Sequence, residues 1–441
     1  MIPLFATQQI LLNLDQLETN ILEFLCEQSS KLRNCATYLL RQSFFTFKKV
    51  LVGKFDLNTD LKENPHYQIF YSQTAQQICT EVTESFLSYK ELLPLWYSGQ
   101  LKDEPKLPKY RKKGGLSGFT YTKQSLAFDI ESGLIRLPLG NTFKAWFGIE
   151  DLKMQMPVNL RFEDIKELRI LPRNGCFYAE FVRETAPMKT NLSRFSKRVL
   201  GIDPGINNWL TCLSNARTSF IIDGRHVKSL NQNYNKRVAK LKARKPQGFW
   251  SEELAAITEK RNRQMRDAVN KAAVLVIERC LRRRLGTIVF GWNKEQRQEA
   301  TLGKNTQDFV QIPTQRLKAR IKQLCEFYDI EFVEVEESYT SKCSFLDEDF
   351  LPTFGEENKP KGWKPSGKRV HRGLYKSADG TLVNADLNGA GNVIRKVEAQ
   401  LGLVNLVKSC KGVLTHPPRL RVWDTKKKRN GAALAHCAVS F

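Results

Sequence analysis

The sequence has no pair of cysteines separated by two residues, although it contains ten cysteines. Such pairs are the usual ligands of a structural zinc site. The cysteines instead stand singly, mostly among apolar residues, which indicates buried thiols rather than a disulfide framework. These are Cys26, Cys35, Cys79, Cys176, Cys212, Cys280 and Cys325. Reduced thiols favour a cytoplasmic protein.

Long hydrophobic runs are also missing. Runs such as Ala272–Ile277 are far shorter than the roughly 20 residues that a membrane-spanning helix needs. The first residues, MIPLFATQQILLNLDQLETN, lack a basic segment followed by a small-residue cleavage site, so export is not expected. At 441 residues, with 41% hydrophobic and 26% charged, the chain has the composition of a soluble protein of several domains without a membrane partner.

Negative charge is scarce. The chain has 70 Lys and Arg residues against 46 Asp and Glu residues, which gives a formal net charge of +24. A protein surface does not need such an excess of positive charge to be soluble. An excess of this kind is typical of a protein that binds the phosphates of a nucleic acid. A nuclease and a generic RNA-binding protein, such as a ribosomal protein, both fit this charge. Composition therefore predicts a nucleic-acid partner but not the activity.

The first half of the chain changes from helices to strands. Leucine and isoleucine recur at helical spacing from Leu11 to Leu25, and Ile69–Tyr89 is a second amphipathic stretch. The basic segment Lys106–Gly115 (KLPKYRKKGG), which contains Arg111 and Lys112, is either a solvated linker or a strap that contacts phosphates. Short strands follow, with a hairpin turn at Pro172–Gly175, and they predict a small barrel.

The second half alternates strands and helices. Three short strands come first, and a helix–strand–helix–strand–helix order follows, which is the order of an RNase H-like α/β fold. The later elements are a long basic helical stretch at Val227–Arg284, a strand at Thr287–Gly291, a helix at Thr314–Phe327, a strand at Ile330–Glu336 and a helix at Asn388–Leu401. Residues 412–441 are expected to form a basic flexible tail.

Two aspartates stand where metal chemistry would need them. Asp203 lies in GIDPGINN at the end of an apolar strand, and Asp386 lies in NADLNGAGN before a helix. Each has an ordinary explanation, because aspartate commonly closes turns and caps helices. Their joint occurrence, in this order and in an RNase H-like pattern, favours a pair of metal-binding carboxylates.

The motifs resemble those of TnpB proteins, transposon-encoded RNA-guided nucleases. GIDPGINN is similar to the first RuvC motif of that family and NADLNGAGN to the third, while SYTSKCS resembles the start of its zinc ribbon, with Cys343 one residue early. NTQDFVQIP and GLYKSADGTLVNAD are similar to the cyanobacterial-like branch. The resemblance covers roughly residues 196–400, and the three motifs together are specific.

The resemblance implies an α+β multidomain protein. The implied parts are a wedge domain with a small β-barrel (1–15 and 116–195), a helical recognition lobe (16–115), a RuvC-like nuclease domain (196–339 and 385–411) and a degenerate zinc-ribbon insertion (340–384). It also implies a guide RNA and a double-stranded DNA target as partners, with one protein monomer for each guide RNA.

The first departure from the family concerns its catalytic glutamate. Gly291 stands where the family usually has this residue, at the end of TIVFG. The next strand ends in VEVEESYTS and is expected to lie beside it. Because alternate residues of a strand face one side, Glu337 continues the row of Val333 and Val335, whereas Glu336 points away. We therefore favour Glu337, with Glu336 as the alternative; a third possibility is that these glutamates are surface charges only.

The second departure concerns metals. Between Thr340 and Asp386 the only candidate zinc ligands are Cys343 and His371, too few for a tetrahedral site, so zinc is not expected. The resemblance implies two Mg²⁺ ions held by Asp203, Glu337 and Asp386, because Mg²⁺ prefers oxygen ligands.

Basic residues of the long helical stretch are the candidate nucleic-acid contacts. They are Lys236, Arg237, Lys240, Lys242, Arg244, Lys260, Arg261, Arg263 and Arg266. The alternative is a solvated helix face.

The leading functional hypothesis is an RNA-guided endonuclease of a transposon that cuts double-stranded DNA next to a short target-adjacent motif. One alternative is an RNA-guided DNA-binding repressor whose nuclease site has decayed at Gly291. The other is a small type V CRISPR effector, which would share the chemistry but take its guide from a different source.

Overall fold

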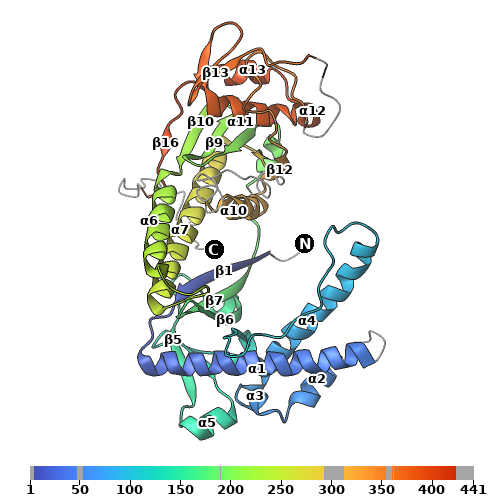
Figure 1. Cartoon of the computed structure of the whole chain (residues 1–441), viewed down its shortest axis with the longest axis vertical. Helices are drawn as coiled ribbons and strands as arrows, with labels where there is room; N and C mark the ends of the chain where they lie inside the picture. The colour runs from blue at the N-terminus through green and yellow to red at the C-terminus, as the bar shows by residue number, and fades with distance from the viewer. Residues whose placement is uncertain are drawn as a thin grey trace. The chain divides into compact units, whose positions relative to one another are not determined.

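The computed structural model describes residues 4–46, 53–188, 190–292, 312–353, 360 and 362–423 (Figure 1). The chain forms two compact units that divide between Thr185 and Ala186. Most of NTQDFVQIP and residues 424–441 of the expected tail lie outside the described residues. None of the helices in the described ranges is both long enough and apolar enough to span a membrane.

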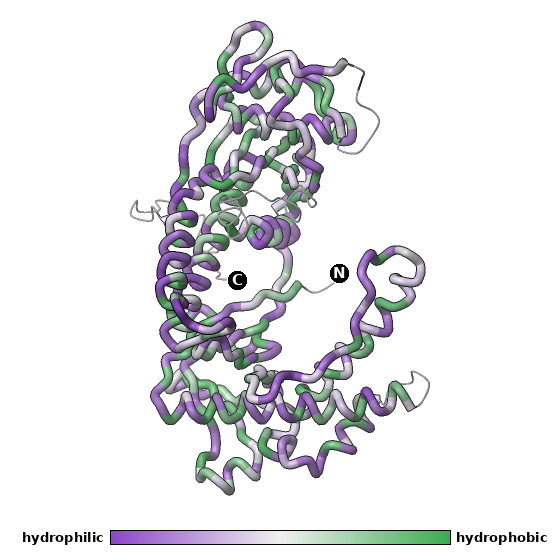
Figure 2. Tube along the Cα trace, in the orientation of Figure 1, coloured by the Kyte–Doolittle hydropathy of each residue, from purple (hydrophilic) through white to green (hydrophobic). Residues whose placement is uncertain are grey.

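The first unit contains a helical part. Its helices are α1 (Gln16–Thr46), α2 (Lys54–Leu61), α3 (Pro65–Gln68) and α4 (Ser72–Tyr97). Figure 2 shows apolar and polar segments interleaved along α1. Leu25 and Leu32 of α1 and Ile78 of α4 are fully buried in one core, which holds the amphipathic helices together.

The strands of the first unit form two antiparallel sheets. The larger has the order β1 (Leu4–Leu11), β7 (Cys176–Thr185), β6 (Ile165–Arg173) and β2 (Phe119–Thr122). The smaller contains β3 (Ala127–Asp129), β4 (Leu134–Pro138) and β5 (Asp151–Gln155), and α5 (Asn141–Phe147) connects β4 to β5. Among the described residues, two open sheets thus stand where we predicted a single small barrel.

The β6–β7 hairpin turns at Asn174 and Gly175, both with positive φ (48° and 72°), as the sequence predicted. The helical interpretation of the first residues was wrong before Gln16. Leu11 belongs to β1, which pairs along its whole length with β7. The apolar residues before Gln16 therefore belong to the edge strand of the sheet.

The second unit is built on a six-stranded sheet. Its order is β12 (Glu331–Val335), β11 (Thr287–Gly291), β8 (Val199–Pro204), β9 (Asn208–Ser214), β10 (Thr218–Asp223) and β16 (Arg419–Leu420). β8, β9 and β10 form an antiparallel meander, and β11 and β12 run parallel to β8. This is the RNase H-like arrangement that the order of elements predicted.

Helices cover this sheet. α11 (Ala385–Arg395) packs against β8, β9 and β11, while α7 (Glu252–Arg283) packs against α6 (Arg225–Lys242) and α10 (Thr314–Phe327). α12 (Glu398–Leu401) and α13 (Leu406–Cys410) follow. Gly201 permits the close approach of α11, because a Cβ there would lie 2.5 Å from the carbonyl oxygen of Ala390.

The insertion and the segment that follows residue 411 contain strands. The insertion contains a small sheet of β13 (Lys368–His371), β14 (Leu374–Lys376) and β15 (Leu382–Asn384). The prediction of a flexible tail from residue 412 was wrong as far as residue 423: β16 pairs with β10, and Leu414 and Val422 are buried. Burial of these two apolar side chains orders the segment.

Candidate active site and nucleic-acid surfaces

Asp203 lies at the carboxyl end of β8, in register with Thr211 of β9. Burial raises the pKa of Asp203 well above its ordinary value, and the charges of Glu337 and Asp386 raise it further, while Arg369 opposes them. The three predicted carboxylates therefore act on one another electrostatically. A site that brings like charges together in this way favours a bound cation.

Helix α11 passes directly over Asp203. A Cβ on Gly389 would lie only 2.6 Å from Asp203 Oδ2, so the helix can approach the carboxylate only because residue 389 is glycine. This contact gives a physical reason for the first glycine of NADLNGAGN.

Asp386 lies in the first turn of α11 but does not cap the helix. Asn384 is the cap, and its Oδ1 accepts from the backbone nitrogens of Asp386 and Leu387, each at 3.0 Å. The Asp386 carboxylate instead accepts from Asn208 Nδ2 at 2.6 Å and from Arg369 Nη2 at 3.2 Å. The ordinary explanation of Asp386 as an N-cap is thus wrong.

Gly291 lies next to Glu337. A Cβ on Gly291 would be 3.5 Å from the Cβ of Glu337 and 2.9 Å from Val393 Cγ2. The glycine therefore leaves room beside β11 for the side chain that follows β12. Glu337 and Asp203 line one pocket of about 310 Å³, together with residues 338–342.

The neighbouring glutamates are engaged elsewhere. Glu336 accepts from the backbone nitrogen of Ser338 at 2.7 Å and from its hydroxyl, and pairs with Lys396 Nζ at 2.7 Å. Glu334 pairs with Lys318 at 2.7 Å. Of these three glutamates, only Glu337 is among the residues that line the pocket with Asp203.

No group of three or more His, Cys, Asp or Glu side chains in the described ranges converges closely enough to hold a metal ion as the side chains stand. The guanidinium of Arg369 lies 3.2 Å from the Asp386 carboxylate and balances its charge. A cation bound among the carboxylates would take over the charge that Arg369 now supplies. The donor set itself, three carboxylates, suits Mg²⁺.

Sequence reasoning missed Arg369 and Asn208. Asn208 lies inside GIDPGINN, five residues after Asp203, so the motif could have indicated it. Arg369 lies on β13 of the insertion. No pattern in the sequence marks it, because the contact with Asp386 depends on the hairpin of β13 and β14.

Hydrogen bonds between residues of the insertion stabilise it. Cys343 is buried, with its thiol 3.6 Å from the carbonyl oxygen of Phe350, while His371 is exposed on β13. Asp349 accepts from the backbone nitrogens of Ser344 and Ser366, at 2.6 Å and 3.1 Å. These contacts link the first part of the insertion to its middle by hydrogen bonds.

The basic residues of α6 and α7 have different roles. Lys236, Lys240, Lys242, Arg244, Lys260 and Arg263 are exposed. Arg237 is half-exposed and lies 3.7 Å from Glu253. Arg261 instead joins the two helices: its Nε donates to Asn231 at 2.9 Å, and burial lowers its pKa. Arg266 lies 3.5 Å from buried Glu259. Arg261 and Arg266 thus make internal contacts, and the exposed residues are the better candidates for phosphate contacts.

The predicted basic strap belongs to the first unit. The backbone of Arg111 is fixed by Asn34 of α1, whose side chain accepts at 2.7 Å and donates at 3.2 Å. Arg111 and Lys112 are exposed, and Arg111 lines a polar pocket of about 510 Å³.

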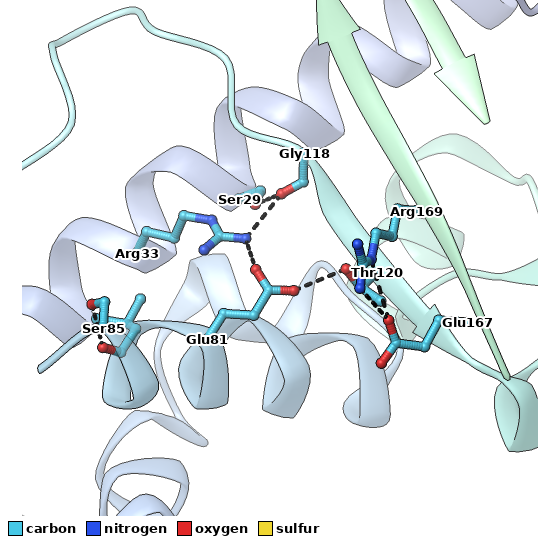
Figure 3. A network of polar contacts seen from close by, with 9 residues as sticks. Ser29, Arg33, Glu81, Ser85, Gly118, Thr120, Glu167 and Arg169 are labelled. Carbon is cyan, nitrogen blue, oxygen red and sulfur yellow. Dashed lines mark hydrogen bonds and ion pairs between the residues drawn. The ribbon is translucent and has the colours of Figure 1, made fainter. Parts of the chain in front are cut away.

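A partly buried ion pair forms one wall of this pocket. Arg33 of α1 pairs with Glu81 of α4 and also donates to the carbonyl oxygen of Gly118 at 3.2 Å, and Thr120 of β2 donates to Glu81 at 2.8 Å (Figure 3). The network connects two helices to a strand and fixes their relative positions.

A second groove lies beside it and shares Gln77. Its volume is about 650 Å³, and the side chains that line it are carboxamides, hydroxyls and two lysines, without a carboxylate. The carboxamides are those of Asn58, Gln73, Gln76, Gln77 and Gln124, and the lysines are Lys123 and Lys166. Carboxamides both donate and accept, as the edges of nucleic-acid bases do.

The comparisons with known proteins agree with this geometry. Residues 189–297, which include the Asp203 motif, α6, α7 and β11, match the family OrfB_IS605, described as a probable transposase. No curated protein matches the chain in sequence. Among solved structures, a Cas12f1–sgRNA–target DNA complex aligns with a TM-score of 0.57 at 15% identity, over 86% of this chain and 83% of that one.

A CasPhi-2 (Cas12j) structure bound to crRNA aligns over 90% of this chain and 98% of that one at 10% identity, with a TM-score of 0.39. The likeness to the Cas12f1 complex shows the fold, which is a multidomain α+β arrangement with a mixed sheet. The match to the transposase family is confined to residues 189–297.

Proposed function

We propose that the chain is an RNA-guided endonuclease that cuts double-stranded DNA at a site formed by Asp203, Glu337 and Asp386. The observation that carries the proposal is the position of Glu337. Its Cβ would be 3.5 Å from a Cβ at Gly291, and it shares a pocket with Asp203. In this proposal Glu337, which follows β12, supplies the carboxylate that β11 lacks at Gly291.

The three carboxylates would hold two Mg²⁺ ions. Such a pair of ions would activate a water molecule and stabilise the leaving 3′ oxygen. Asn208 orients Asp386 through its 2.6 Å hydrogen bond. Gly389 fixes the distance between α11 and Asp203. Arg369, half-exposed and 3.2 Å from Asp386, places a guanidinium where it can bind the scissile phosphate once cations neutralise the carboxylates. Zinc has no role in this proposal.

The partners in the proposal are a guide RNA and a duplex DNA target, with one copy of the protein for each guide. The net charge of +24 supports a polyanionic partner. The groove with carboxamides and lysines is a suitable place to read a short target-adjacent motif, because glutamine can form two hydrogen bonds to adenine in the major groove. Sequence beyond the motif would be read by pairing with the guide.

The decisive experiment is plasmid cleavage by the protein purified with its co-expressed RNA, in the presence of Mg²⁺. We expect Glu337→Gln to lower the rate at least about 100-fold, since it removes one charge from the site. Glu334→Gln is the matched control, because Glu334 pairs with Lys318 away from the pocket, and it should keep the wild-type rate.

Two results would contradict the proposal. If wild-type complex binds its target but does not cut, the chain is the RNA-guided repressor that Gly291 also permits. If Glu336→Gln abolishes cleavage while Glu337→Gln does not, the assignment of the glutamate is wrong. The genomic neighbourhood, with transposon ends or a CRISPR array, would separate a transposon nuclease from a type V effector.

A further inference from the structure

The tip of the α6–α7 hairpin combines exposed aromatic and basic side chains. Trp250 is 52% exposed, and Phe249 beside it is partly buried. From Arg225 to Trp250 the chain contains no aspartate or glutamate. Its basic residues are Arg225, Lys228, Lys236, Arg237, Lys240, Lys242, Arg244 and Lys245. An exposed tryptophan therefore stands at the end of a strongly basic hairpin.

The tip has a defined backbone. Arg244 and Gly248 both have positive φ, 59° and 84°, so the chain turns twice between the helices. Backbone hydrogen bonds join Lys245 to Lys242 and Phe249 to Pro246, each at 3.1 Å. The hydroxyl of Ser251 caps α7 by accepting from the backbone nitrogen of Leu254 at 3.2 Å. Trp250 thus precedes a capped helix and is held at a fixed place on the tip.

Lysine ammonium groups lie over both rings. Lys242 Nζ is 5.9 Å from the centre of the Trp250 ring, and Lys245 Nζ is 5.2 Å from that of Phe249. These are cation–π distances. Each ring is therefore next to a cationic group that can bind a phosphate.

We propose that this tip is a stacking site for an unpaired base or for the end of a nucleic-acid duplex, with Lys242 and Lys245 on the flanking phosphates. Aromatic stacking needs no particular base, because every base has a flat π face. A protein partner could also use a tryptophan. The eight basic residues from Arg225 to Lys245 outnumber the two carboxylates that follow Trp250, Glu252 and Glu253, and this excess favours a polyanion. The site does not depend on the nuclease assignment, since it concerns binding alone.

The test is the affinity of the full-length protein for fluorescein-labelled oligonucleotides, measured by anisotropy for single-stranded RNA, single-stranded DNA and a blunt-ended duplex. We expect Trp250→Ala to weaken binding about tenfold for at least one of the three, and Trp250→Phe to restore most of the affinity. Trp146→Ala is the matched control: Trp146 is 62% exposed on α5, and its removal should leave all affinities unchanged.

The lysines give an independent readout. Replacing Lys242 and Lys245 together by glutamine should lower the slope of log affinity against log salt by about 1.4–1.8, while Trp250→Ala should leave the slope unchanged. Which oligonucleotide responds identifies RNA or DNA as the ligand. Unchanged affinity of Trp250→Ala for all three would overturn the proposal. So would a lowered melting temperature without loss of binding, which would mean that the tryptophan packs against protein.

Discussion

Replacement of Gly389 by alanine is expected to slow cleavage strongly while the protein stays folded. The new Cβ would lie 2.6 Å from Asp203 Oδ2, and ordinary contact begins near 3.4 Å, so the carboxylate or the helix must move by about 0.8 Å. Misplacement of a reacting group by about 1 Å can cost about 100-fold in rate. We therefore expect the Mg²⁺-dependent cleavage rate to fall about 100-fold.

The effect on stability should be small. Alanine gains about 1 kcal/mol over glycine inside a helix, and the added methyl group costs about 1–3 kcal/mol in strain. These contributions oppose each other, and a net loss of about 2 kcal/mol lowers Tm by less than about 8 °C in a domain of this size. Thermal unfolding followed by circular dichroism measures this change.

Gly391→Ala is the matched control on the same helix. A Cβ there would also meet its neighbour at 2.6 Å, but the neighbour is the buried ring of Phe345 instead of Asp203. This variant should lose stability and keep its cleavage rate below its melting temperature. If Gly389→Ala cleaves like the wild type, the contact between α11 and Asp203 is irrelevant to activity, and our account of the site is refuted.

Three further outcomes are expected. Without divalent metal, Asp203→Asn should raise the melting temperature near pH 8, because the pKa of Asp203 is raised in the folded protein and its ionisation therefore opposes folding at high pH. The difference in melting temperature between variant and wild type should vanish as the pH falls below about 4. An equal difference at both pH values would contradict this. Glu81→Ala should lower the free energy of unfolding, measured by chemical denaturation, by about 2–4 kcal/mol, because Arg33 keeps a largely buried charge. Loss of the exposed Lys31–Glu27 pair should lower it by less than about 0.5 kcal/mol. Similar losses for the two pairs would show that burial does not matter. Arg369→Ala should slow cleavage at least about tenfold without weakening target binding in a filter assay, and a loss of binding instead would place its role outside the site.

Much of the second unit could be predicted from its sequence. The strands of an RNase H-like sheet are short apolar runs with helices between them, so their order is visible in the chain. The alternation of Val333 and Val335 also predicted the direction of Glu337, because a strand has a period of two residues. The pocket that Glu337 shares with Asp203 agrees with that direction.

Other features depend on contacts between distant residues and left no local pattern. β1 is a strand because it pairs with β7, about 170 residues later, although its apolar residues also fit a helix. Arg369 reaches Asp386 only through the β13–β14 hairpin, and β16 is ordered by the edge of β10. Local propensity does not report such tertiary pairings. The roles of the site residues stay predictions until the variants are measured.

Gly291 and Glu337 have a consequence for how activity is inferred from alignments. β11 and β12 run parallel, with Gly291 opposite Val335, so the two possible carboxylate positions lie on adjacent strands only two residues apart in register. In the proposed site, Glu337 supplies just after β12 the charge that β11 lacks at Gly291. Homologues that appear to lack a catalytic residue at one alignment column can therefore retain the charge at the same place in space.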